Sequence, residues 1–168
     1  MKISKTSRLL SLYHLFRYCE EISYKEVTDL MPVSEKTIYR DICLLRQAGI
    51  INPQFSKKRN AFVLPPGESL PPRFPENKSQ KLYLEKIIRL CKMMAHLPEE
   101  SPDIWYHAHY PELSERTRQR DFAELNKIGY EITYQRWDDG DEDRPVGSTY
   151  CDFPYDTYSL ATFDLGDF

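Results

Sequence analysis

The sequence predicts a mainly α fold with small β-hairpins, of the α+β class, built from two similar units in tandem. The stretch VSEKTIYRDICLLRQAGI at residues 33–50 returns eighty residues later as LSERTRQRDFAELNKIGY at 113–130. Each stretch is preceded by apolar residues at helical spacing and followed by a segment that alternates as a strand does. A proline-rich segment separates the two units. A pattern written twice in this way indicates a duplicated unit.

The two stretches agree at the positions that begin, pack and end a helix. Aligned without gaps, they share seven of eighteen residues, and three further positions are conservative replacements. The identical pairs are Ser34/Ser114, Glu35/Glu115, Thr37/Thr117, Arg40/Arg120, Asp41/Asp121, Leu45/Leu125 and Gly49/Gly129.

Two helices are expected before the first copy of the stretch. Apolar residues recur at helical spacing over about residues 7–19. Ser23, with Glu26 three residues later, is a capping-box pattern that opens a short second helix. Pro32 is expected to end it.

The first copy itself is expected to form a third helix, with Ser34 as N-cap and Gly49 as the terminating residue. The following residues 50–66, IINPQFSKKRNAFVLPP, alternate as a strand, a basic turn and a strand. Three helices followed by a hairpin predict a winged helix-turn-helix domain over residues 1–64.

Residues 65–77, PPGESLPPRFPEN, contain five prolines and a glycine and predict an extended linker. The second unit, residues 78–168, repeats the element order as a second winged-helix-like domain. A long helix and a short one precede the repeated stretch, which has Ser114 as N-cap and Gly129 as terminator. The hairpin after it has an acidic turn, DDGDED, and an acidic tail follows.

Charge is distributed unevenly along the chain. The net charge is -3, yet residues 1–64 hold eleven basic and six acidic side chains, a net of +5. Residues 137–168 hold one basic and nine acidic side chains, a net of -8. The basic first half favours a polyanionic partner.

A helical wheel separates two faces of the repeated stretch. Ile38, Ile42 and Leu45 fall on one face, which is expected to pack. The opposite face of the first copy carries Lys36, Arg40, Cys43 and Gln47, and that of the second copy carries Arg116, Arg120, Ala123 and Lys127. A charged outward face is often only solvated, but its place in this element order favours the major groove of DNA.

The pattern Ser34-x-x-Thr37-x-x-Arg40-Asp41-x-x-x-Leu45-x-x-x-Gly49 resembles the recognition-helix signature of DeoR-like winged helix-turn-helix regulators. These include the N-terminal domains of WYL-domain transcription factors. The resemblance covers about residues 5–64, and the second copy is similar to the same signature except for Arg118 at an apolar position. It implies DNA binding by the helix-turn-helix part alone. We expect no WYL or effector module within these 168 residues, and ligand sensing is therefore not inferred.

Candidate DNA contacts follow from the wheel and the resemblance together. In the first unit they are Ser34, Lys36, Thr37, Tyr39, Arg40 and Gln47 on the helix, and Lys57, Lys58 and Arg59 in the basic turn. In the second unit they are Arg116 and Arg120. Asp41 and Asp121 are expected to orient a basic side chain within their own unit, because a carboxylate gains nothing from approaching phosphate.

No catalytic residue, cofactor site or metal site is expected. His107 and His109 lack further ligands at site-like spacing, and the glycine of DDGDED is misplaced for a calcium loop. The four cysteines contain no CxxC pair and are expected to be reduced. No phosphate-binding glycine loop or nucleophile elbow occurs, so an enzyme is not expected.

We therefore expect a sequence-specific transcription regulator whose partner is double-stranded DNA, with a homodimer as a second expectation. The alternative is a winged-helix adaptor whose acidic C-terminal half binds a protein. Whether the second unit reads DNA or mediates association stays open. Charges interrupt the apolar run near the N-terminus, so neither a signal peptide nor a membrane span is expected, and a cytoplasmic location is.

Overall fold

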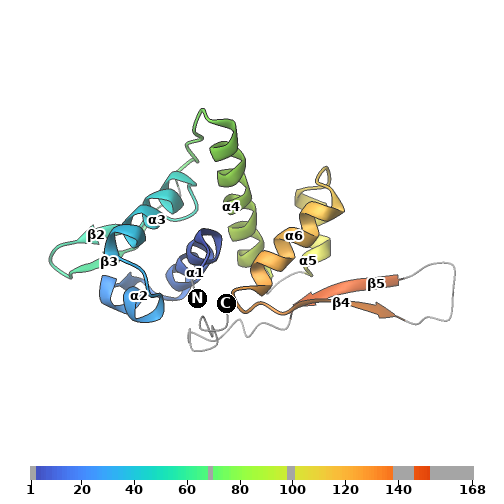
Figure 1. Cartoon of the computed structure of the whole chain (residues 1–168), viewed down its shortest axis with the longest axis horizontal. Coiled ribbons are helices and arrows are strands. Elements are labelled where there is room, and N and C mark those ends of the chain that lie inside the picture. Colours follow the sequence, from blue (N-terminus) through green and yellow to red (C-terminus); the bar gives the residue numbers. More distant parts are fainter. Residues whose placement is uncertain (1–2, 68–69, 98–100, 138–145, 152–168) are drawn as a thin grey trace.

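The computed structural model describes residues 3–67, 70–97, 101–137 and 146–151, and of residues 133–137 and 146–151 it describes the backbone only. The fold is mainly helical with small antiparallel sheets (Figure 1). In chain order the elements are α1 (Lys5–Tyr18), β1 (Glu21–Ile22), α2 (Tyr24–Leu30), α3 (Glu35–Gln47), β2 (Gln54–Ser56), β3 (Ala61–Val63), α4 (Lys78–His96), α5 (Pro102–His109), α6 (Glu115–Asn126), β4 (Ile132–Trp137) and β5 (Val146–Cys151).

Side-chain caps begin α2, α3 and α6 at the residues that the sequence predicted. Ser23 accepts from the Glu26 amide while Glu26 accepts from the Ser23 amide, so the predicted capping box at α2 is confirmed. Ser34 and Ser114 cap α3 and α6 in the same way, each accepting from the amide three residues later. The helix starts in both halves are therefore encoded locally.

A three-stranded sheet in the first half has the order β1-β3-β2, with both pairs antiparallel. Ile22 lies opposite Phe62, and Phe55 lies opposite Phe62 on the other side. The predicted hairpin β2–β3 is confirmed, whereas β1 was not predicted. Two residues are too short to show an alternating pattern, and β1 exists because it pairs with β3. In the second half β4 pairs with β5, which confirms the second predicted hairpin.

One hydrophobic cluster runs through both halves of the described chain. It joins buried residues of α1, such as Leu9 and Leu12, to buried residues of α4, such as Ile87 and Leu90. Helix α1 packs against α4 and also against α6, and α1 and α4 occupy the centre of Figure 1. The predicted linker does separate two sets of elements, but the two sets share this buried interior.

Helices of each half contact helices of the other half. While α1 of the first half reaches α6, the end of α3 packs on α4 through Leu44 and Ala48 against Leu84 and Ile88. Two polar contacts join the same helices. The Thr6 and Tyr83 hydroxyls lie 3.2 Å apart, and Arg17 donates to the Met94 carbonyl at 2.8 Å. The halves are thus held in a defined relative position.

In the described part of the chain, no helix combines the length and the apolar character needed to cross a membrane.

Candidate nucleic-acid interface

Helix α3 presents a basic face outward and an apolar face inward. Ile38, Ile42 and Leu45 are at most 1% exposed, as predicted for the packing face. Lys36 and Arg40 are exposed on the other side, and Tyr39 beside them is 49% exposed. Among the described residues neither Lys36 nor Arg40 takes part in an ion pair. Their charges are available to an external anion.

A buried ion pair fixes α3 to α1. Asp41 accepts from Arg8 at both carboxylate oxygens, from Nε at 2.7 Å and from Nη2 at 3.3 Å. The Asp41 side chain is 4% exposed and that of Arg8 12%. A bidentate pair restricts rotation as well as separation. The prediction that Asp41 orients a basic side chain within its own unit is confirmed, and it leaves Arg40 pointing the other way.

The ends of α3 are also fixed, and this affects two of the predicted contacts. The Ser34 hydroxyl accepts from the Thr37 amide at 3.3 Å and lies 3.0 Å from the Thr37 hydroxyl. Both hydroxyls therefore serve the cap, although Ser34 remains exposed. At the other end Gly49 has φ 70°, a left-handed conformation that confirms its predicted role as terminator.

Gln47 differs from the other predicted contacts because the linker binds it. Its side-chain amide donates to the Arg73 carbonyl at 2.9 Å, and its own carbonyl accepts from the Arg73 amide at 2.9 Å. A Cβ on Gly49 would collide with the Leu70 carbonyl, so the linker also passes close to the helix end. Half-buried Gln47 is therefore engaged within the chain by the linker.

The turn between β2 and β3, here called the basic turn, comprises Lys57, Lys58 and Arg59. All three side chains are exposed. Arg59 pairs with Glu21 at 3.0 Å, but the two side chains are 60% and 42% exposed, so this contact is weak and solvent-screened. Lys57 and Lys58 have no ion pair among the described residues. The basic turn thus presents exposed positive charge that is available to phosphates.

Aromatic packing supports the sheet beneath the basic turn, and the sequence reasoning did not foresee it. Tyr24 of α2 contacts Phe62 edge-on at 5.0 Å between ring centroids, and Phe55 contacts both rings at 5.7 and 5.3 Å. Burial, and then the nearby Glu35, raise the pKa of Tyr24 above its usual value. The cluster couples α2 to the strands that carry the basic turn.

The second half repeats the arrangement of the first around α6. Arg116 and Arg120 are exposed on its outer face. Asp121 accepts from Arg89 of α4, from Nε at 2.5 Å and from Nη2 at 3.0 Å, which is the same atom pairing as in the first half. The prediction for Asp121 is confirmed as well. The two pairs also have similar spacing in the sequence, because Arg8 and Asp41 are 33 residues apart and Arg89 and Asp121 are 32 residues apart.

Arg118, at the position of buried Ile38, packs in a different way. Its guanidinium bonds to Asp103 of α5 at 2.5 Å and to Glu115 at 3.1 Å, with His107 also at 3.1 Å. The Arg118 side chain is 16% exposed. At this position an ion pair between α5 and α6 therefore takes the place of the apolar packing that Ile38 makes in the first half. The acidic turn of this half and the acidic tail lie outside the described residues.

No group of three or more His, Cys, Asp or Glu side chains in the described ranges is arranged to hold a metal ion. His107 contacts Arg118, and the Nδ1 atom of His109 lies 2.8 Å from the Trp105 carbonyl.

The chain matches no family model, no curated protein and no solved structure.

Proposed function

We propose that the chain is a sequence-specific, double-stranded DNA-binding regulator that reads the major groove with α3. The observation that carries the proposal is the exposed face of α3. Lys36, Tyr39 and Arg40 lie on this face, and among the described residues none of them pairs with an acid. On the opposite face Asp41 holds the helix in place through its ion pair with Arg8. Precise base readout needs side chains on a rigid element. A merely solvated face would not require this fixation.

The element order supports a winged helix-turn-helix unit in the first half. Helix, strand, two helices and a hairpin follow one another, and the sheet order β1-β3-β2 lets the hairpin stand beside α3 (Figure 1). In this arrangement α2 crosses the DNA backbone while α3 enters the groove. The same order recurs in α4, α5, α6 and β4–β5, which favours a tandem of two such units. Among the described residues, the second unit has no strand that corresponds to β1.

The proposed DNA contacts have different roles because their side chains differ in chemistry. Arg40 has the planar fork that pairs with the O6 and N7 acceptors of guanine, and Lys36 and Tyr39 flank it. The basic turn supplies attraction to phosphates that does not depend on base sequence. Arg116 and Arg120 on α6 are secondary contacts in this proposal. The first half is the principal reader, because its turn is basic where the corresponding turn of the second half is acidic.

The test is duplex binding as a function of salt, for a random sequence and for a sequence selected from a random pool. We expect affinity to fall steeply with salt for both, and the selected duplex to bind at least about 1,000-fold more tightly at physiological salt. Weak binding that is equal for both duplexes would favour the alternative, an adaptor that binds protein through its acidic C-terminal half.

A further inference from the structure

The outer face of α4 carries exposed apolar side chains. Leu82 is 55% exposed there, and Phe74 of the linker is 44% exposed. The Lys81 ammonium lies 5.8 Å from the Phe74 ring centroid, which places the linker residue against this face. Large apolar side chains that gather in one exposed area mark interaction surfaces more often than chance exposure does.

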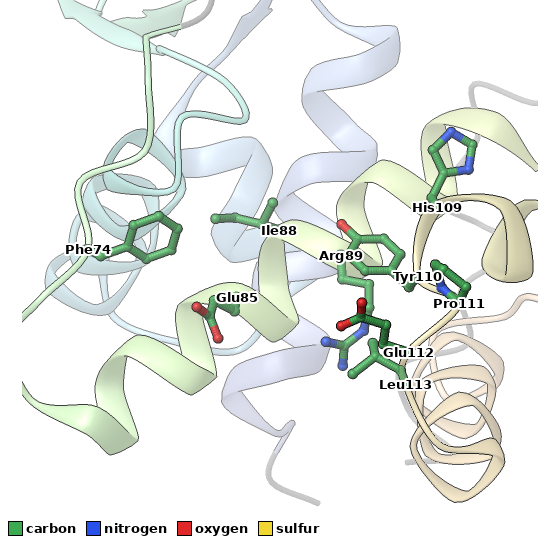
Figure 2. Close-up of a pocket in the computed structure, with 9 residues that line it drawn as sticks. All are labelled: Phe74, Glu85, Ile88, Arg89, His109, Tyr110, Pro111, Glu112 and Leu113. Atoms are coloured by element: carbon green, nitrogen blue, oxygen red, sulfur yellow. The ribbon is translucent and has the colours of Figure 1, made fainter.

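Next to Leu82 the surface is hollow. A cavity of about 510 Å³ lies between α4, the linker and the connection from α5 to α6 (Figure 2). Its apolar wall contains Phe74, Ile88 and Leu113, the last of which is 37% exposed. Figure 2 shows Glu85 between Phe74 and Arg89, with Glu112 on the far side. One face of the molecule thus carries an apolar projection and an apolar recess side by side.

The unpaired charges on this face change sign along α4. Lys78 and Lys81 lie before Leu82, and Glu85 and Glu112 border the cavity after it. Of the neighbouring basic side chains of α4, Arg89 in the cavity wall pairs with Asp121, and Lys86 pairs with Glu124. The free charges therefore run from positive to negative along one stripe, since residues 78, 81, 82 and 85 share a helix face.

We propose that this face is a homodimer interface in which two copies pair their α4 helices antiparallel across a two-fold axis near Leu82. An antiparallel pairing sets the lysine end of one copy against the glutamate end of the other, and it does so twice. The two Leu82 side chains then meet near the axis, and the recess of each copy lies beside this contact. A parallel pairing would set like charges opposite each other, so the charge order selects the antiparallel one.

The outer face of α4 at its N-terminal end gives the partner access. The first turns of the helix extend beyond α1 and α6 in Figure 1. A second copy can approach this end without displacing α3, whose outer face is turned elsewhere by the Asp41–Arg8 pair. The dimer leaves both reading helices accessible, although its existence does not depend on DNA binding.

The experiment is sedimentation equilibrium of the full chain without DNA, over a concentration series, with charge reversals on the two ends of the stripe. Glu85→Lys alone sets lysine against lysine at both contacts, and Lys78→Glu with Lys81→Glu sets glutamate against glutamate. We expect each variant to dimerise at least about tenfold more weakly than the parent. Glu20→Lys, an exposed charge reversal outside the face, should dimerise as the parent does.

Mixing the two variants is the decisive step. A heterodimer of the Glu85→Lys variant with the Lys78→Glu, Lys81→Glu variant has opposite charges at both contacts. The mixture should therefore dimerise more tightly than either variant does alone. A parent that stays monomeric at all concentrations would overturn the proposal. A parent dimer that neither reversal weakens, or a mixture that does not recover, would place the interface on another surface.

Discussion

Asp41 is an acidic residue next to the basic side chains that are proposed to contact DNA. Its burial explains why an acid is found at this position. Its carboxylate is bonded twice to Arg8 and is 4% exposed, so the pair holds α3 rather than meeting the DNA. Removing one partner of a buried pair leaves an uncompensated charge inside the protein. Asp121 and Arg89 repeat this in the second half.

Asp41→Ala should lower the free energy of unfolding by about 3–5 kcal/mol, because Arg8 loses its only described counter-charge. The matched control is Glu21→Ala, which breaks the exposed pair with Arg59 and should cost less than about 1 kcal/mol. Urea unfolding of both variants measures the difference. Equal costs would mean that the Asp41–Arg8 pair does not stabilise the fold.

His14 makes stability depend on pH below neutrality. It is 1% exposed on α1, with its ring 4.8 Å from that of Tyr18, and burial, followed by the charge of Arg17, lowers its pKa to about 4. The unfolded chain, with a pKa near 6.5, takes up the proton first as pH falls. The stabilising contribution is therefore complete above pH 6.5 and is lost between pH 6.5 and 4.

The His14 contribution amounts to about 2 kcal/mol between pH 7 and pH 5. Denaturant unfolding at these two pH values should show this loss in the parent. In His14→Phe the loss should be smaller by that amount, because the variant has no imidazole to protonate. The same pH dependence in both proteins would assign the effect to other groups.

The basic turn is an element whose effect on binding should not depend on base sequence. Lys57, Lys58 and Arg59 are exposed, and the one ion pair among them is solvent-screened. Changing all three to Gln should weaken binding to every duplex by a similar factor and reduce the slope of log affinity against log salt by about one unit per lost phosphate contact. Lys92→Gln, on α4, should leave the slope unchanged. If the triple variant also keeps the parent slope, the basic turn does not contact phosphate.

Local signals predicted the helices well and the contacts between them poorly. Ser23, Ser34 and Ser114 are caps where the sequence expected them, and Gly49 and Gly129 both have positive φ. These features depend on residues within one turn of each other. The two-residue β1, the linker bonds of Gln47 and the partners of the two buried aspartates depend on residues tens of positions apart.

The same distinction applies to the candidate interface. The apolar and basic faces of α3 were predictable because helical periodicity alone separates them. The engagement of Gln47 by Arg73 was not, since nothing in a proline-rich linker indicates which surface it will follow. Arg118 shows the same limit, because its ion pair with Asp103 depends on how α5 packs against α6.

The molecule should unfold in one cooperative transition, although its sequence contains two similar units. The buried cluster passes from α1 to α4 without interruption, so separating the halves exposes apolar surface on both. Calorimetry should give a single transition whose van't Hoff and calorimetric enthalpies agree. Leu90→Ala, at a buried site on α4, should shift that whole transition to lower temperature. Two separable transitions would show that the linker divides the chain into independent domains.

If α3 reads base sequence, Arg40 is the side chain whose removal should change the selected sequence most. Selection from a random duplex pool should yield a defined motif with the parent. Arg40→Ala should bind that motif about 1–3 kcal/mol more weakly and lose preference at one base position, with unfolding little changed because the side chain points away from Ile38 and Ile42. Arg120→Ala, the equivalent change in α6, should have the smaller effect. An Arg40→Ala variant that selects the same motif with the parent's affinity would show that Arg40 does not read base sequence.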